Sequence, residues 1–247
     1  GQYMPPAVAD NRRMTPRHYA LAELLLAIEN AAAAAGRPRA TRLLAVSKTR
    51  TPSEVAALAD AGQVAFGENY VQEALPKIDA LRGRGLEWHL IGHLQSNKAK
   101  DAALAFDWVQ SVDRPRLVAA LARHRPAEAP PLDVLVQVNI DDEASKHGCT
   151  PMDVDALADA VAAEPRLRLR GLMAIPAPHE DPARRRAAFR AMARLFADLQ
   201  DRYPGIDTLS MGMSEDFAEA IAEGATMVRI GSALFGPRPS KHEESTA

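Results

Sequence analysis

The chain has 247 residues, of which 25% are charged, with a formal net charge of -2 and a single cysteine, Cys149. The length suits one large α/β domain or two smaller ones, the near-neutral charge argues against nucleic-acid and anionic-membrane partners, and one cysteine excludes an internal disulfide or a cysteine-rich zinc site. Because no apolar run is long enough to span a membrane and no stretch resembles a signal peptide, we expect a cytoplasmic protein.

The spacing of apolar residues predicts one helix followed by a regular alternation of strands and helices. Residues from about 16 to 35 combine Ala, Leu and Glu at helical spacing, which predicts a first helix. The consecutive apolar residues of segment 42–47 predict a strand buried on both faces, as in parallel sheets. Further strands are expected over 64–67, 87–91, 107–111, 132–139, 167–173, 208–211 and 227–230. Helices are expected over 53–62, 70–81, from about 97, and over 115–124, 152–163, 182–202 and 214–222.

Eight strands that alternate with helices predict a closed (β/α)8 TIM barrel with an extra N-terminal helix, and an open doubly wound sheet is the alternative. We expect one barrel domain over residues 14–236, a flexible N-terminal segment over 1–13 and a C-terminal tail over 237–247. In such barrels the ligand site lies at the carboxyl ends of the strands, and phosphate groups often bind after the seventh and eighth strands.

Lys48 stands at the carboxyl end of the first predicted strand. A lysine with apolar neighbours at that position can attack a carbonyl group and form a Schiff base. These residues alone slightly favour a lysine whose side chain simply extends from the strand end into water, and only the rest of the chain favours the Schiff base.

The seventh and eighth strand ends combine glycine with serine. Ser214 follows Gly212 and is expected at the start of a helix, where free N–H groups suit a phosphate, although an ordinary helix cap uses serine in the same way. Arg229 lies in an otherwise apolar strand and should therefore face a polar partner inside the barrel. The pair Gly231 and Ser232 adds a second turn rich in amide groups. A lysine that can form an imine, a phosphate cradle and a buried polar group are what a pyridoxal 5'-phosphate (PLP) site needs.

Two other features have simpler explanations. His89 and His93 are four residues apart, which would place them on one face of a strand and permit a metal site. Without a third ligand we expect core or loop histidines instead. The polar segment 143–148 fits a lid, an anion contact or a solvated turn equally well.

Five motifs in order resemble the pyridoxal phosphate homeostasis protein family, and they occupy residues 45–49, 66–73, 88–98, 209–214 and 228–231. The resemblance implies a fold-type III PLP protein similar to the barrel domain of alanine racemases. Such a protein acts in PLP homeostasis: it buffers PLP and hands it over to PLP-dependent client enzymes, without a robust reaction of its own.

The resemblance also implies roles for individual residues. Lys48 forms the internal aldimine, and Asn69 lies near the cofactor. Arg229 faces the pyridine nitrogen, where a cation cannot keep the ring protonated as a carboxylate would, so the electron sink is weak. The phosphate is held by Ser214, Gly231 and Ser232. No catalytic or metal-binding residue is expected.

A PLP-dependent amino-acid racemase of the alanine racemase type is the alternative function. Racemisation by two bases needs an acid/base group on each face of the imine, and Lys48 can serve one face. Racemases of this fold resemble one another in taking the second base, a tyrosine, from a C-terminal β domain, which we do not expect here. Tyr70 is the tyrosine that can be placed near the strand ends.

An unrelated barrel enzyme that uses Lys48 as a Schiff-base lysine for an aldol reaction ranks last. The acid/base carboxylates that we would expect for it are missing at the strand ends. We expect a monomer.

Overall fold

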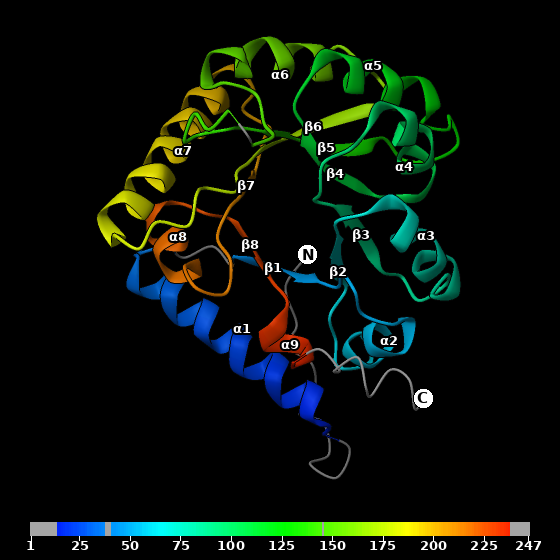
Figure 1. The fold of residues 1–247 in the computed structure, drawn as a ribbon, viewed down its shortest axis with the longest axis vertical. Helices are drawn as coiled ribbons and strands as arrows, with labels where there is room; N and C mark the ends of the chain where they lie inside the picture. Colours follow the sequence, from blue (N-terminus) through cyan, green and yellow to red (C-terminus); the bar gives the residue numbers. More distant parts are fainter. Residues whose placement is uncertain (1–13, 38–40, 145, 238–247) are drawn as a thin grey trace.

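The computed structural model describes residues 14–37, 41–144 and 146–237, so the expected segment 1–13 and tail residues 238–247 lie outside the described residues. Within these ranges, eight parallel strands close into a barrel in chain order, and the helices surround it (Figure 1). The closure is direct, because residues 42–45 of the first strand pair with residues 227–230 of the last. The predicted (β/α)8 barrel is confirmed, and the open sheet is excluded.

The strands are short and largely buried, as expected for a parallel barrel. They are β1 (Arg42–Val46), β2 (Ala65–Glu68), β3 (Glu87–Leu90), β4 (Trp108–Val112), β5 (Leu132–Gln137), β6 (Leu167–Met173), β7 (Thr208–Ser210) and β8 (Met227–Ile230). The α-helices are α1 (Pro16–Ala34), α2 (Pro52–Asp60), α3 (Val71–Ala80), α4 (Ala99–Ala105), α5 (Pro115–His124), α6 (Val154–Ala162), α7 (Pro182–Arg202), α8 (Phe217–Glu223) and α9 (Ser232–Phe235). Short 3-10 turns η2 (Ser96–Lys98) and η3 (Pro151–Asp153) precede α4 and α6. Most bounds agree with the prediction within a few residues.

Near the C-terminus one prediction is wrong and one element was not predicted. The helix expected from residue 214 begins at Phe217, and its N-cap residue is Asp216 rather than Ser214. The carboxylate of Asp216 accepts a hydrogen bond from the backbone N–H of Met213 at 2.7 Å, which folds this segment into a turn before the helix starts. The short helix α9 after β8 was not expected, because four residues are too few to show helical periodicity.

The extra helix α1 begins at a capping box, in which the Thr15 hydroxyl accepts a hydrogen bond from the backbone N–H of His18. Its buried face is formed by Leu21, Leu24 and Ile28, which have the spacing of one helical stripe. This face packs against α8 and α9, next to the seam where β8 meets β1 (Figure 1). None of the helices in the described part of the chain has the length and hydropathy needed to cross a bilayer.

Candidate functional site

The carboxyl ends of the eight strands meet at one end of the barrel, which we call the mouth. Because the strands are parallel and the barrel is closed, residues that follow different strands share one rim there. All the residues predicted to bind the cofactor lie at this end, within β8 or after β1, β2, β7 and β8. They are Lys48, Asn69, Ser214, Arg229, Gly231 and Ser232.

Lys48 is half-buried in the turn after β1, and the residue before it is fixed by a buried ion pair. Ser47 Oγ donates to Glu68 Oε2 at 2.8 Å, and Lys77 Nζ lies 2.7 Å from Glu68 Oε1. Lys77 also donates to the backbone oxygen of Ser47 at 2.8 Å. Burial raises the pKa of Glu68, and the hydrogen bond and charge of Lys77 oppose that rise. The end of β1 is therefore tied to β2 and α3 directly beneath Lys48.

Thr49, on the other side of Lys48, has a left-handed backbone with φ of 64°. Such a conformation is strained for a β-branched residue and costs about 1–3 kcal/mol. Glu73 accepts a hydrogen bond from the backbone N–H of Thr49, and Lys77 Nζ lies 2.9 Å from the same carboxylate. The chain is thus held in a sharp turn immediately after Lys48.

The ion pair between Glu68 and Lys77 was not predicted, although the sequence contains a signal for it. Lys77 stands at the same helical spacing as the buried residues Val71 and Ala74, so a lysine occupies the apolar face of α3. A buried lysine needs an acidic partner, and Glu68 at the end of an apolar strand is in the right place to supply it.

Arg229 is only 3% exposed and points into the mouth end of the barrel. Its Nη1 donates to Ser210 Oγ at 2.7 Å and its Nη2 donates to the backbone oxygen of Ala174 at 2.8 Å. Burial lowers the pKa of Arg229 to about 10, with the nearby charge of Asp216 acting in the opposite direction, so the side chain is still a cation at neutral pH. No carboxylate among the described residues forms an ion pair with it. The prediction that Arg229 faces a polar partner is confirmed.

The hydrogen bonds continue from Ser210 down the barrel axis. Ser210 Oγ donates to Gln110 Oε1 at 2.7 Å, Gln110 Nε2 lies 2.9 Å from His89 Nδ1, and His89 Nε2 lies 2.7 Å from Glu87 Oε1. Arg42 donates to the same Glu87 oxygen at 2.9 Å. We call this series the polar chain; its members are Arg229, Ser210, Gln110, His89, Glu87 and Arg42.

Complete burial lowers the pKa of His89 to about 4, against the pull of the Glu87 carboxylate, so the ring is neutral at neutral pH. Nδ1 then accepts from Gln110 and Nε2 donates to Glu87, which assigns the tautomer from the network. His89 is the core histidine that the sequence led us to expect. It does not share a strand face with His93, because β3 ends at Leu90.

Asn69 follows β2 and has an unsatisfied polar atom at the mouth. Its Oδ1 is buried and has no hydrogen-bond partner among the described residues. The backbone of Asn69 packs so closely on Gly92 that a Cβ atom at Gly92 would lie 2.0 Å from the backbone oxygen of Asn69. A buried polar atom without a partner is costly, so this position fits contact with a polar ligand.

The two turns expected to hold a phosphate lie on the same rim. Ser214 is exposed in the turn before α8, and Ser232 is exposed at the start of α9. A Cβ atom at Gly231 would lie 3.0 Å from the Val46 oxygen, and one at Gly212, where φ is 103°, would lie 2.7 Å from the Ala220 side chain. Both glycines therefore allow close backbone packing beside the exposed hydroxyl groups.

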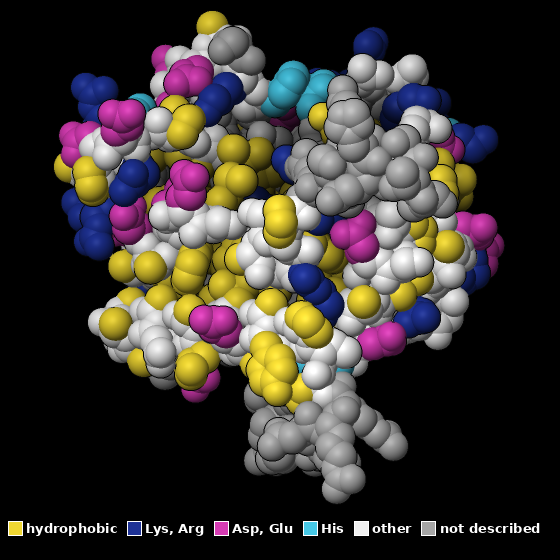
Figure 2. Space-filling model, turned by 60° about the horizontal axis from the view of Figure 1, so that its bottom comes forward, with side chains coloured by type: hydrophobic (Ala, Val, Ile, Leu, Met, Phe, Trp, Pro, Cys, Tyr) yellow, Lys and Arg dark blue, Asp and Glu magenta, His cyan; other side chains and the backbone are white. Residues whose placement is uncertain are grey.

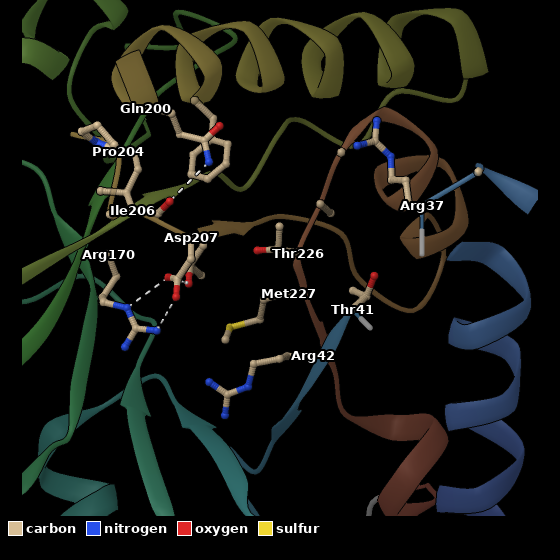
Figure 3. Close-up of a pocket in the computed structure, with 16 residues that line it drawn as sticks. Arg37, Thr41, Arg42, Arg170, Gln200, Pro204, Ile206, Asp207, Thr226 and Met227 are labelled. Atoms are coloured by element: carbon tan, nitrogen blue, oxygen red, sulfur yellow. Dashed lines mark hydrogen bonds and ion pairs between the residues drawn. The ribbon is translucent and has the colours of Figure 1, made fainter. Parts of the chain in front are cut away.

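A cavity of about 700 Å³ lies at the opposite end of the barrel, beside the amino ends of β7 and β8 (Figure 3). Two of its three arginines have carboxylate partners, and Arg37 donates to the backbone oxygen of Ala222 at 3.3 Å. Arg170 bonds Asp207 through Nε at 3.1 Å and Nη2 at 2.9 Å, and Arg42 pairs with Glu87. This end of a barrel serves stability rather than ligand binding in enzymes of the fold.

The family model for the alanine racemase N-terminal domain matches residues 21–239. The pyridoxal phosphate homeostasis protein of Escherichia coli K12 is 55% identical over 222 residues, which cover 88% of this chain and 95% of that protein. The chain belongs to the pyridoxal phosphate homeostasis protein family. Its resemblance to pyridoxal phosphate homeostasis proteins, predicted from five motifs, is confirmed.

Two further family members agree with this assignment. The pyridoxal phosphate homeostasis protein of Pseudomonas aeruginosa is 53% identical over 219 residues, covering 88% of this chain and 94% of that protein. The structure of PipY from Synechococcus elongatus PCC7942 with PLP bound matches with a TM-score of 0.76 and 35% identity. The match covers 89% of this chain and 100% of that chain. The family relation thus spans the whole barrel.

Proposed function

We propose that this protein binds PLP covalently through Lys48 and acts in PLP homeostasis without robust catalysis of its own. Buried Arg229 is the observation that carries the proposal. It is a cation with no ion-pair partner in the described part of the chain, and it lies at the mouth of a barrel whose first strand ends in a half-buried lysine. PLP would supply an aldehyde for the lysine and an acceptor nitrogen for the guanidinium.

The remaining residues suit the other polar groups of PLP. Asn69 offers its amide oxygen, which has no hydrogen-bond partner among the described residues, and the phosphate would be held by the turns at Ser214, Gly231 and Ser232. Because α8 begins only at Phe217, Ser214 would act through its hydroxyl and the turn backbone rather than through a helix N-terminus.

The names of the relatives support this proposal. Both bacterial relatives are named for PLP homeostasis, and PipY was solved with PLP bound. We further propose a cytoplasmic monomer that passes PLP to client enzymes. Basic and acidic side chains are interspersed on the face shown in Figure 2, which gives no support for a nucleic-acid partner.

An amino-acid racemase is the second candidate, favoured by the alanine racemase family model. Racemisation needs a second acid/base held firmly against the substrate. Tyr70, the tyrosine predicted near the mouth, is 64% exposed, which does not suit that role. The carrier function is therefore the better supported one.

The test is covalent capture of PLP. Purified protein is mixed with PLP, reduced with borohydride and analysed by peptide mass spectrometry, alongside Lys48→Ala and the matched variant Lys100→Ala on the exposed face of α4. We expect the PLP adduct in the wild type and in Lys100→Ala but not in Lys48→Ala, which should keep weaker, non-covalent binding. An adduct in Lys48→Ala would contradict the assignment. Turnover of one amino acid enantiomer into the other at an enzyme-like rate would favour the racemase.

A further inference from the structure

A cluster of potential metal ligands lies at the mouth, apart from the residues assigned to PLP. His93 follows β3, Asp113 follows β4 and His147 lies in the loop after β5. One ligand atom from each residue lies within 4.8 Å of the other two. The two imidazole rings stack with their centroids 3.7 Å apart and an interplanar angle of 12°.

The carboxylate of Asp113 is oriented by its surroundings. Its side chain is 9% exposed; the backbone N–H of Gly148 donates to Oδ2 at 3.0 Å, and Arg114 donates to Oδ1 at 2.9 Å. Arg114 is itself fixed by a bond to the backbone oxygen of Leu94 at 2.8 Å. Each carboxylate oxygen has a second lone pair for a metal ion, and outer-shell bonds of this kind are what hold metal ligands in place.

The loop that carries His147 is folded back toward His93. Gly148 has φ of 111°, and a Cβ atom there would lie 2.6 Å from the backbone nitrogen of Asn139. The Asn139 side chain in turn donates to the backbone oxygen of Glu143 at 2.8 Å. The position of His147 beside His93 is thus set by backbone contacts and does not depend on ring stacking alone.

We propose that His93, Asp113 and His147 bind a divalent transition metal ion, with Zn²⁺ as the expected ion. Imidazole nitrogen and carboxylate oxygen are ligands that Zn²⁺ prefers, and three protein ligands leave a fourth position open to water or another ligand. Bonds of about 2.1 Å in a tetrahedron require ligand atoms about 3.4 Å apart. Both histidines are exposed, so rotation of their rings can close the remaining distance.

The bound ion would join three loops on one side of the mouth. Gly92, next to His93, is the residue on which Asn69 packs, so the metal site adjoins the proposed PLP site. A metal ion here would restrict the loops after β3, β4 and β5 relative to one another. It would thereby stiffen the rim beside Asn69.

The test uses the full chain, stripped of metal with a chelator and free of PLP, and titrated with Zn²⁺ by calorimetry. We expect one equivalent to bind and the affinity to fall at least tenfold in His93→Gln and in His147→Gln. Replacement of Zn²⁺ by Co²⁺ should give visible bands typical of a tetrahedral site. His124→Gln is the matched control, because His124 ends α5 at the opposite end of the barrel.

Two outcomes would overturn the proposal. One is an affinity in His93→Gln and His147→Gln equal to that of the wild type, and the other is no saturable binding of either ion to the wild type. Because both side chains are exposed, the variants should melt at the wild-type temperature, which a thermal unfolding curve verifies. The site does not depend on PLP, so Lys48→Ala should bind Zn²⁺ as the wild type does.

Discussion

Arg229 carries a positive charge in a place where a protein rarely leaves one without a counterion. Its two bonds, to Ser210 and to the Ala174 backbone, use neutral acceptors, and a guanidinium has five N–H donors in total. At the scale of single residues, this buried charge, bonded only to neutral acceptors among the described residues, is the clearest sign of a ligand. It could be predicted in part from the sequence, because an arginine inside an apolar strand must find polar partners.

Arg229→Ala should change the absorption spectrum of bound PLP and weaken PLP binding by about 10- to 150-fold. The estimate is the roughly 1.5–3 kcal/mol that a buried hydrogen bond to a charged group contributes. Spectra and a PLP titration would measure both effects, with Arg190→Ala, an exposed arginine on α7 paired with Glu223, as the control. An unchanged spectrum and affinity would place Arg229 away from the ring.

The strained backbone of Thr49 could not be predicted at this scale. Threonine favours extended conformations, and nothing in the run Ser47, Lys48, Thr49 indicates a left-handed residue. The conformation depends on Glu73, which is 24 residues away and binds the Thr49 amide. Long-range partners of this kind are not visible in local patterns.

At the scale of elements, α3 supports the lysine turn through one of its own lysines. Lys77→Met should destabilise the protein by about 3–5 kcal/mol, because Glu68 would remain buried without its partner. Urea denaturation measures the loss. The loss should shrink at lower pH, since protonation removes the unpaired charge of Glu68.

The matched control for this ion pair is the double variant Lys77→Met with Glu68→Leu. Replacement of both charges by apolar groups leaves no buried charge, so most of the lost stability should return. A loss below about 1 kcal/mol in Lys77→Met alone would mean that the ion pair does not support β1 as described.

The periodicity of apolar residues predicted long elements well. It predicted element boundaries poorly where local hydrogen bonds determine where a helix begins. The 21-residue helix α7 was predicted to the residue, because many turns repeat one apolar stripe. The start of α8 was missed, because Ser214 looks like a cap while Asp216 forms the turn that precedes the helix. The cluster of His93, Asp113 and His147 was also missed. Its members follow three different strands, and only the closed barrel brings them together.

At the scale of the whole molecule, the polar chain crosses the barrel from the mouth to the far end. It starts at Arg229 beside the proposed PLP site and ends at Arg42, which lines the cavity at the amino ends of the strands (Figure 3). Gln110 of β4 and Ser210 of β7 join the two sides of the barrel across its interior. The barrel interior thus contains one continuous path of hydrogen bonds.

The neutral, buried His89 should make stability fall in acid. Its pKa is lowered from 6.5 to about 4 in the folded barrel, so between these values the unfolded chain takes up a proton that the folded chain does not. This contribution is fully present above pH 6.5 and is lost toward pH 4, by about 1.4 kcal/mol per pH unit and about 3 kcal/mol in all. Urea denaturation at about pH 7 and about pH 4.5 would measure it.

His89→Gln isolates this effect from the titration of the carboxyl groups. Glutamine keeps a polar group at the position but takes up no proton, so the variant should lose less stability between the two pH values than the wild type does. Equal losses in both proteins would show that His89 is not the group that titrates.

The direction of the hydrogen bonds in the polar chain has a consequence for how such sequences diverge. Each member donates to the next, from Arg229 to Glu87, so replacement of one member by an apolar residue leaves a buried neighbour unpaired at a cost of about 1–3 kcal/mol. Single substitutions at these positions, made one at a time, are therefore disfavoured. Positions 42, 87, 89, 110, 210 and 229 should be inherited as a set and should change, if at all, in compensating combinations, although they belong to five different strands.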